Sequence, residues 1–535
     1  MPAYDIRAPR PRLYFRLAAN TAMGARAQFV NNAQIALVAL QTGMTLSDPG
    51  ACQWSATFVA TPVGTKVEDL LAGRIANVTS LKATSDFWYD TVQPMDVMGV
   101  GFGKENPYFI GSVLKKQRTR SAVGGKVVNS VTISGIALGG IFSRQNVMYM
   151  PTIDTSCLTN PALPAFWRSL ANTAFGERPQ NIDGKAAMQM DRVIKMIFTD
   201  YVTLDIRFPT AAQQQAHAQE ALHRAWLVAN SALRPDWPEP VLYATLKSYM
   251  DLESGIAPEL SEFRVEAYNR LLVMQGSLWQ IVREIVPLPW FEMWFDVGMD
   301  GQKVVLYARQ PPFSIDRWRN DPNLGKVPES GHARVFDTIT AEDVTNEDLG
   351  ADWSEVLTIF QPMATDYVWA GGADLTQINR PWFSKRLCER FGLRAYQPEI
   401  THMPIRKDDR NYDDVVAWMP EARRLLAEWY GCNDLMVSGS LTIKGRTDIR
   451  IGNKVKYYAD QKQLTEFYCE GVQQAWSLQT PWTTTLTLTR GMTQEQREFA
   501  VTEANTIKAD NASFLYIEDN PALNAHDEEF NPRRP

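Results

Sequence analysis

The chain has 535 residues, of which 45% are apolar and 21% are charged. At roughly 100 to 200 residues per domain this length corresponds to about three to five domains, and the composition is that of a globular chain that buries real cores. With 54 Lys and Arg against 60 Asp and Glu, the formal net charge is -6. This balance excludes nucleic-acid binding driven by overall charge as the main role, so any contact with DNA requires a local basic patch.

No stretch of the sequence predicts a membrane-spanning helix, which needs about 20 apolar residues. The longest apolar run near the N-terminus covers only Ile35 to Leu40, and Arg and Pro interrupt the first residues where a signal peptide needs an apolar core. The five cysteines are widely separated and form no Cys-x-x-Cys pair. They are therefore interpreted as reduced thiols, most of them small core residues.

Residues 1–148 are expected to be mostly β. Apolar residues alternate with glycines from Met98 to Phe102, and residues 108–133 have the pattern of a hairpin that turns at two glycines.

Residues 149–286 are expected to be largely helical. Apolar residues at helical spacing predict one helix over 210–233. A second helix is marked by a capping box of Ser277 and Gln280, and Pro287 ends it.

A hairpin over 290–309 follows, and residues 313–432 then form a mixed, partly exposed segment with helices predicted over 384–392 and 421–430. From Ser438 to Gly491 the alternation of apolar and polar residues predicts a small β-barrel or sandwich.

A short helix from Thr493 to Ala504 leads into an acidic tail. We expect this tail to be extended unless a partner orders it.

The motifs of three common reaction classes are absent: a Gly-x-Ser-x-Gly elbow, a Walker A loop and a His-Glu-x-x-His helix. His217 and His223 lie six residues apart, which places them on different faces of a helix, and the other histidines are isolated in the sequence. We therefore name no catalytic residue, no metal ligand and no cofactor.

Two features keep alternative functions open. Asp86 and Asp90 flank three aromatic residues, a composition that suits a cleft of a glycan hydrolase as well as an ordinary solvated loop. The 16 tryptophans suit either core and interface packing or the stacking platforms of a carbohydrate-binding adhesin. Loop and core packing are the favoured interpretations.

One dense basic run is a candidate for electrostatic contacts. It consists of Lys115, Lys116, Arg118 and Arg120. On a strand the last three share one face, which is typical of a solvated face or of a protected sheet edge. The run could instead meet phosphate or an acidic protein surface, and we favour the edge interpretation.

The C-terminal β segment contains four motifs in a fixed order, Gly439–Gly445, Ile449–Asn453, Phe467–Val472 and Trp482–Gly491. This order resembles the last β domain of phage baseplate hub proteins, a family that includes late-control-type hubs and the spike base of type VI secretion systems. Three upstream segments are similar to the same family in the same order: Asp96 to Gly135, Gln275 to Trp279, and Leu306 to Phe313. The likeness therefore spans most of the chain.

This resemblance implies an α+β structural protein with two β-barrel-like tube domains and two outer insertions. The tube domains are assigned to residues 1–148 and to 287–312 with 433–492, and the insertions to the helical 149–286 and the mixed 313–432, with 493–535 as a C-terminal helix and tail.

The implied role is a baseplate hub in the virion tail, made in the host cytoplasm, and not an enzyme. Three copies would form a ring that adapts the hexameric tail tube protein to the trimeric central spike protein and lines the central channel, with transient passage of DNA and of the tape measure protein. Other baseplate proteins would contact the insertions.

The positions that carry the hub motifs are Gly111, Gly135, Gly276, Arg309, Phe313, Gly439, Arg450, Gly452, Tyr468, Gly471, Arg490 and Gly491. At one of them the sequence makes a conformational prediction: the turn after Ile451 needs a backbone shape that only glycine tolerates, so Gly452→Val should impair folding or tube docking.

Overall fold

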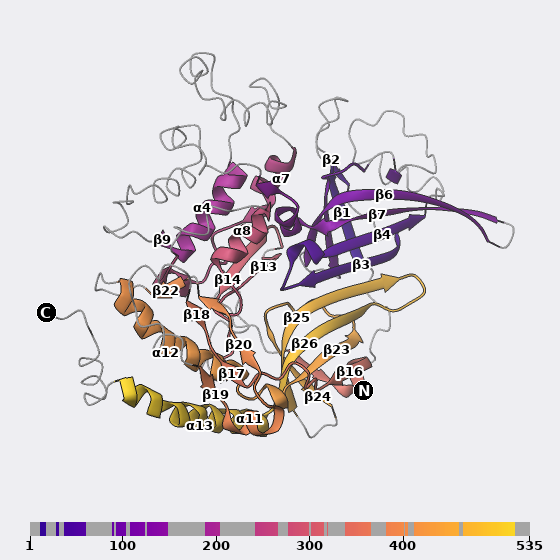
Figure 1. Cartoon of the computed structure of the whole chain (residues 1–535). Coiled ribbons are helices and arrows are strands. Elements are labelled where there is room, and N and C mark those ends of the chain that lie inside the picture. Colours follow the sequence, from indigo (N-terminus) through magenta and orange to yellow (C-terminus); the bar gives the residue numbers. More distant parts are fainter. Residues whose placement is uncertain are drawn as a thin grey trace, which may run out of the picture.

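A computed structural model describes residues 11–17, 28–30, 37–59, 88–89, 92–102, 107–123, 126–147, 188–203, 241–265, 276–298, 301–314, 318, 337–364, 381–400, 402–404, 411–459 and 464–518. In this part of the chain most elements are strands, and half of the 26 described strands form one large and mostly antiparallel sheet. Figure 1 shows this sheet along one side of the molecule and the helices along the other.

The large sheet has thirteen strands. Eleven of them follow one another in space in the order β16 (Val344–Gly350), β23 (Val437–Lys444), β26 (Thr483–Thr493), β25 (Leu464–Ser477), β3 (Leu37–Thr45), β4 (Gln53–Val59), β7 (Lys126–Ala137), β6 (Phe109–Val123), β5 (Val97–Phe102), β1 (Pro11–Leu17) and β2 (Gln28–Val30). Strand β24 (Lys454–Tyr458) also pairs with β25, and β15 (Asp337–Thr340) adds to β24 in parallel.

Strands from the two ends of the sequence share this sheet. β25 pairs antiparallel with β3, in a register that runs from Gly471 opposite Thr45 to Ser477 opposite Ala39. The prediction of separate barrel-like domains is therefore not confirmed, because the described strands form no closed barrel. In a closed barrel the two edge strands would pair with each other. Here β25 and β3 pair instead and join the two β segments into one open sheet.

One face of the sheet is apolar on both sides of this junction. In the N-terminal part the buried face carries Trp54, Phe58 and Ile133. In the C-terminal part it carries Leu441 and Leu486. This period of two is the alternation that the sequence predicts for strands with one buried face.

The hairpin predicted over 290–309 is confirmed as β13 (Glu292–Val297) and β14 (Val304–Arg309), with β10 (Met250–Asp251) added in parallel to β14. One side of the hairpin belongs to the largest core, together with the helices. The other side places Trp294, Val305 and Tyr307 against Ile451. The hairpin is thus a layer between the helices and the large sheet.

The helices near the hairpin are α4 (Met190–Thr203), α7 (Val241–Tyr249) and α8 (Leu278–Ile285). The capping box predicted for α8 is confirmed: the Gln280 backbone N–H donates to Ser277 Oγ at 3.2 Å, and the Ser277 N–H donates to Gln280 Oε1 at 3.0 Å. The helix predicted over 210–233 lies outside the described residues.

A second group of helices consists of α11 (Lys385–Phe391), α12 (Asn411–Tyr430) and α13 (Gln494–Glu518). α11 has the predicted limits, with Ser384 capping its start. The predicted start of α12 at residue 421 is wrong, because the helix runs through Pro420. Trp418 and Met419 are buried just before this proline, and their packing offsets the hydrogen bond that proline cannot donate.

α13 begins as predicted but does not end at Ala504. Thr493 and Gln496 cap its start reciprocally. The helix then continues to Glu518, since Ile507 and Asn511 are buried and Asn511 Nδ2 donates to the Phe383 carbonyl at 3.1 Å. The expectation of an extended chain directly after residue 504 is therefore wrong, and residues 519–535 lie outside the described part.

Short strands complete the fold in small sheets. They are β9 (Met188–Gln189), β11 (Phe263–Val265) and β22 (His402–Pro404); β8 (Asn146–Val147) and β12 (Gly276–Ser277); β17 (Ile359–Phe360), β19 (Trp382–Phe383) and β20 (Ala395–Tyr396); and β18 (Met363–Ala364) with β21 (Glu399–Ile400). None of the helices in the described part of the chain combines the length and the hydrophobicity that crossing a membrane requires.

Candidate functional site

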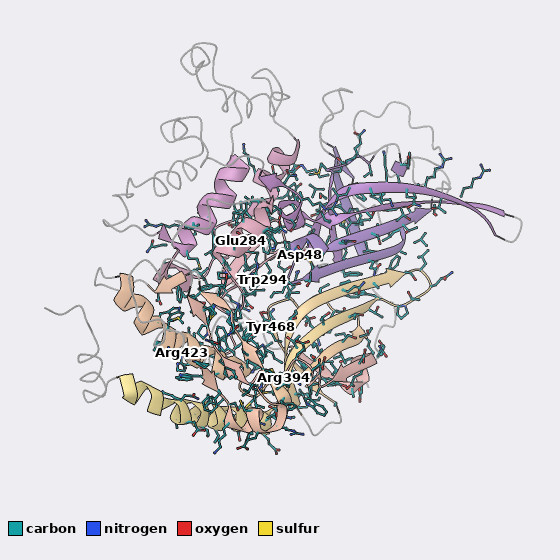
Figure 2. All side chains as sticks on the ribbon, viewed as in Figure 1. Asp48, Glu284, Trp294, Arg394, Arg423 and Tyr468 are labelled. Atoms are coloured by element: carbon teal, nitrogen blue, oxygen red, sulfur yellow. The ribbon has the colours of Figure 1, made fainter. Side chains whose placement is uncertain are left out.

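Arg309, one of the motif positions, lies at the centre of a buried polar cluster. Its Nε donates to Glu292 Oε1 at 2.5 Å, and its Nη2 donates to the Gly452 carbonyl at 2.6 Å. The Tyr468 hydroxyl donates to the other oxygen of Glu292 at 2.5 Å. We call these four residues the joint, because they tie the hairpin β13–β14 to the C-terminal part of the large sheet. Figure 2 shows Tyr468 and the adjacent Trp294 near the middle of the molecule.

Burial and hydrogen bonding shift the pKa values of the joint. Burial is the largest influence on Glu292 and raises its pKa above the ordinary value, although Arg309 and Tyr468 oppose this shift. Burial lowers the pKa of Arg309, but the Glu292 carboxylate and Tyr468 outweigh it, and the pKa is raised above its ordinary value. Burial and the same carboxylate raise the pKa of Tyr468 well above its ordinary value, so its hydroxyl remains a donor. A buried charge without a partner is costly, so each member of the joint depends on the others.

Gly452 has the backbone shape that its motif predicts. Its φ is 75°, in the left-handed region that favours glycine. A Cβ atom at this position would lie 2.9 Å from the ring of Trp294, which itself stacks beneath the guanidinium of Arg309 at 4.9 Å. The close fit of backbone, ring and guanidinium explains why a side chain at 452 cannot be accommodated.

The two other motif arginines connect further segments to the joint. Arg450 Nη1 donates to the Tyr108 carbonyl at 2.6 Å and to Asp296 Oδ1 at 2.9 Å, and thereby links the N-terminal strands, the hairpin and the C-terminal turn. Arg490 Nη1 donates to the Trp429 carbonyl at 2.6 Å, and its guanidinium lies 3.7 Å from the ring centre of Phe313.

Phe313 in turn meets the edge of Tyr468 at 5.1 Å between ring centres. The structure therefore brings Arg309, Phe313, Gly452, Tyr468 and Arg490 together in one contact network, although they are spread over 182 positions of the sequence, from 309 to 490 inclusive.

The remaining motif glycines do not belong to this network. Gly111 and Gly135 lie on β6 and β7 and leave room for the indole of Trp54, whose Nε1 donates to the Ser112 carbonyl at 3.1 Å. The others are distributed over separate strands: Gly276 on β12, Gly439 on β23, Gly471 on β25 and Gly491 on β26. They serve local backbone packing.

The face of the large sheet opposite its apolar core is polar and uncharged over its central strands. On β3 and β4 this face presents Gln41, Gln53 and Ser55, on β7 it presents Ser134, and across the junction it presents Gln473, Thr485 and Thr487. We call this surface the open polar face. Its alternating threonines, from Thr483 to Thr487, are visible in the sequence, where they predict a strand but do not indicate this surface.

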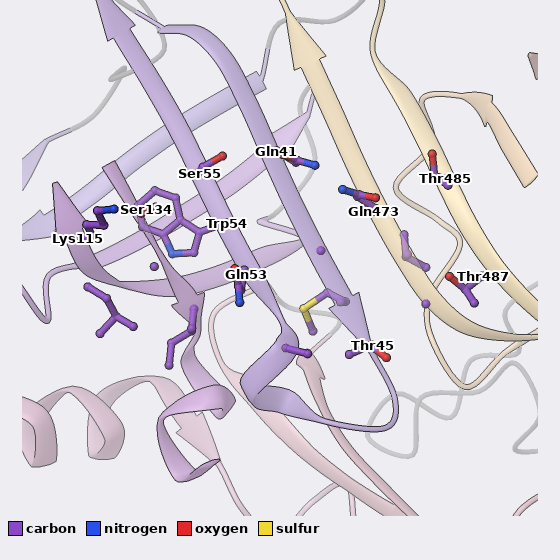
Figure 3. Close-up of a pocket in the computed structure, with 18 of the residues that line it drawn as sticks. Gln41, Thr45, Gln53, Trp54, Ser55, Lys115, Ser134, Gln473, Thr485 and Thr487 are labelled. Atoms are coloured by element: carbon purple, nitrogen blue, oxygen red, sulfur yellow. The ribbon is translucent and has the colours of Figure 1, made fainter. Parts of the chain in front are cut away.

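The open polar face is hollowed where the two β segments meet, with a volume of about 780 Å³. Figure 3 shows Gln41 and Gln473 facing this region from β3 and β25, with Ser55, Ser134 and Thr485 on the strands to either side. Lys115 and Arg144 are the ionisable residues among those that line the hollow. Its lining offers hydroxyl and amide groups, and it holds no carboxylate among the described residues.

Hydroxyl groups on this face also bond to one another across strands. Thr57 and Thr132 approach to 3.1 Å between their Oγ1 atoms, and Thr442 and Thr485 to 3.0 Å. Such cross-strand pairs stabilise a sheet modestly and leave the surface neutral.

The structure separates the members of the basic run. Lys116 is half-buried, because its Nζ donates to the carbonyls of Tyr89 and Val92 at 2.5 and 3.0 Å. Lys115, Arg118 and Arg120 are exposed on β6. Lys116 is therefore a local anchor, whereas the other three side chains are exposed at the surface.

A charged cluster links β24, β25 and α13. Glu466 pairs with Lys454 at 2.9 Å and with Arg497 at 3.3 Å, and it accepts a hydrogen bond from Trp318 Nε1 at 2.9 Å. Burial opposes ionisation of Glu466, but these donors outweigh it and lower its pKa.

Few observations favour the alternative functions. Asp86 and Asp90 lie outside the described residues, and so do His217 and His223. Most tryptophans of the described part are buried, with Trp353 the exposed one, so core packing accounts for them. The described part also holds no cluster of three or more acidic, histidine or cysteine side chains that could bind a metal.

Neither family models nor curated protein sequences give a match to this chain. Solved structures give similarities that extend over most of its length. A tail protein from Neisseria meningitidis is 10% identical with a TM-score of 0.45, and the match covers 90% of this chain and 96% of that one.

A prophage tail protein from Shewanella oneidensis is 7% identical with a TM-score of 0.41, over 90% of this chain and 97% of that one. A component of the type VI secretion system from E. coli is 7% identical with a TM-score of 0.32, over 86% of this chain and 74% of that one. These three solved structures are a tail protein, a prophage tail protein and a component of the type VI secretion system.

Proposed function

We propose that this protein is a structural subunit of a phage baseplate hub, of which three copies form a ring around a central channel. In this proposal the open polar face lines the channel, and the ring adapts the hexameric tail tube to the trimeric central spike. The outer insertions contact other baseplate proteins, and no residue has a catalytic role.

The observation that carries the proposal is the continuity of the sheet between the two β segments. Because β25 pairs with β3, one chain presents strands of both segments side by side, with a single polar face. Two similar segments per chain would give a trimer six positions around a ring, which is the number a hexameric tube presents. The motif residues of the hub family support this geometry, because Arg309, Arg450 and Tyr468 hold the segments together.

The chemistry of the open polar face suits a channel that a polymer passes through. Fixed Lys and Arg side chains retain DNA through its phosphates, whereas hydroxyl and amide groups stay hydrated and form no ion pairs. Apart from Lys115 and Arg144, the residues that line the hollow carry no charge, so the lining favours passage of DNA or of the tape measure protein over retention.

The test is the absolute mass of the purified chain by light scattering. A mass three times the protomer's 60.4 kDa supports the hub. A dimer or a tetramer contradicts the ring. If the chain alone is monomeric, the same measurement is made with the spike protein added, and a persistent monomer then contradicts the proposal.

A further inference from the structure

The outer half of the β6–β7 hairpin has few neighbours within the described structure. Pairing of β6 with β5 ends at Ser112, and pairing of β7 with β4 ends at Ser130, whereas β6 and β7 pair with each other as far as Val123 and Lys126. We call residues 115–130 the arm. Figure 1 shows the hairpin extending well beyond the neighbouring strands. A two-stranded hairpin is marginally stable in water, so a partner along the arm would stabilise it.

The arm is basic. Lys115, Arg118 and Arg120 are exposed on it, and its sequence contains no Asp or Glu. A partner that fits the arm must therefore present negative charge.

A surface of that kind lies at the far end of the same sheet. β16 pairs with β23 on one side, and no described strand pairs with its other side. The segment 341–355, which we call the acidic edge, contains six carboxylates and no Lys, Arg or His. Asn346, Glu347 and Asp348 are exposed on the strand itself.

Some of these carboxylates have partners within the chain and still face solvent. Glu347 accepts a hydrogen bond from the Tyr457 hydroxyl at 2.6 Å, and Asp343 pairs with Lys444 at 3.2 Å. Charged side chains on an edge strand prevent indiscriminate pairing and admit a partner of opposite charge.

The arm and the acidic edge of one copy cannot meet. Seven strand spacings separate β16 from β6 in the sheet, which is about 34 Å at roughly 4.8 Å per strand. Two complementary surfaces at opposite ends of one molecule are the requirement for a head-to-tail contact that closes into a ring.

We propose that the arm of one copy docks on the acidic edge of the next copy, and that this contact closes the ring. The inference rests on the proposed function and deepens it, because it assigns the interface between subunits. β16 gains a neighbour along the side on which no described strand pairs with it. The arm gains a third strand or surface beyond those that the described residues provide, and the charges set the direction in which subunits follow one another.

Charge reversal tests the contact. Arg118→Glu with Arg120→Glu should weaken trimer formation at least tenfold at low salt, as measured by light scattering over a dilution series. Glu342→Lys with Asp348→Lys should weaken it similarly, and the chain with all four changes should recover trimer formation to within threefold of the wild type. In the wild type, trimer formation should weaken as salt is raised, since salt screens exposed charges beyond roughly 10 Å.

The matched control is Lys385→Glu with Arg390→Glu on α11, two exposed residues whose reversal changes the net charge equally. The control should form trimers as the wild type does. The inference is wrong if the variant with Arg118→Glu and Arg120→Glu forms trimers as well as this control does. It is also wrong if the chain with all four changes fails to recover trimer formation while the variant with Glu342→Lys and Asp348→Lys remains folded.

Cross-linking gives a second and independent readout. Copies that carry Arg120→Cys are mixed with copies that carry Asp348→Cys and then oxidised. The mixture should give a disulfide-linked dimer that neither variant gives alone. The amount of this dimer should exceed the background that the wild-type cysteines give. Links within the Arg120→Cys variant alone would indicate contact between two arms and would overturn the inference.

The two proposals fail in different ways. A wild-type trimer without the specific link would refute the arm contact and leave the hub intact. The absence of a trimer even with the spike present would refute the ring itself.

Discussion

The joint and the open polar face lie only a few strands apart, yet they differ in charge. The joint contains an ion pair, whereas the central strands of the open polar face present uncharged side chains. In the joint, Glu292 is buried and the Arg309 side chain is only 13% exposed, and hydrogen bonds that involve three segments of the chain hold both. On the open polar face, the central strands present hydroxyl and amide groups at the surface. In the joint an ion pair shielded from solvent holds segments of the chain together, whereas the central strands of the open polar face present uncharged groups to the surface.

The strongest test of this comparison removes one charge from the joint. Arg309→Ala leaves Glu292 buried without its partner, and we expect the free energy of unfolding to fall by about 3–5 kcal/mol. Chemical denaturation measures the loss. The double change Glu292→Leu with Arg309→Met should cost less than Arg309→Ala alone, and Arg390→Ala on the exposed side of α11 serves as the control. A loss below about 1 kcal/mol in Arg309→Ala would show that the joint does not hold the segments together.

A second test concerns the backbone of the joint. Gly452→Val must adopt a φ of 75° next to the ring of Trp294, and we expect it to cost about 1–3 kcal/mol and to reduce trimer formation. Thermal unfolding and light scattering measure the two effects. Gly43 on the open polar face has room for a Cβ, with its nearest contact at 3.8 Å. Gly43→Ala should therefore behave like the wild type, whereas Gly452→Ala should already be destabilised.

The third test uses pH. The folded state holds the pKa of Glu466 below its ordinary value near 4.5, so the stabilisation from this residue is present above that pH and is lost as the pH falls through the lowered pKa. Glu466→Gln should cost about 1–2 kcal/mol at pH 7, and the difference from the wild type should shrink in acid. Unfolding measured from pH 7 to pH 3 checks this, and a difference that stays constant over that range would contradict it.

The smallest effect on stability is expected on the open polar face. Ser55→Lys with Gln473→Lys should change the free energy of unfolding by no more than about 0.5 kcal/mol and should leave the trimer intact, because both positions face solvent. In phage particles the same change should slow the release of DNA, since each lysine can retain phosphate in a salt-dependent way. Ser55→Thr with Gln473→Asn is the neutral control. Normal DNA release in the lysine variant would argue that this face does not line the channel.

Local sequence signals predicted much of the fold. The capping box of Ser277 and Gln280, the cap of α11 at Ser384 and the hairpin β13–β14 are confirmed, because each depends on residues close together in the sequence. The four described cysteines are free thiols, three of them buried, as expected.

Contacts between distant residues could not be predicted in this way. The pairing of Gly471 with Thr45 joins strands more than 400 positions apart, and no local pattern specifies it. The acidic residues of β16 have low strand propensity, so the sequence predicts only a mixed region here. The segment is a strand because it pairs with β23 at the side of the large sheet.

The candidate site shows the same division. The motifs in the sequence point to Arg309, Tyr468 and Gly452 one by one. Only the fold shows that Arg309 and Tyr468 both bond to Glu292 and that Arg309 also bonds to the carbonyl of Gly452. Glu292 itself carries no signal in the sequence, because a single carboxylate in an apolar strand belongs to no motif. The open polar face was likewise missed, since hydroxyl and amide residues are common on solvated strands.

The most direct test of the hub is a three-dimensional reconstruction of the assembled protein by electron cryo-microscopy. The hub proposal predicts a closed ring with three-fold symmetry, in which Gln41, Ser55 and Gln473 face the central opening and the arm of each subunit lies on the acidic edge of the next. A ring with the open polar face on its outside, or an assembly without three-fold symmetry, would contradict it.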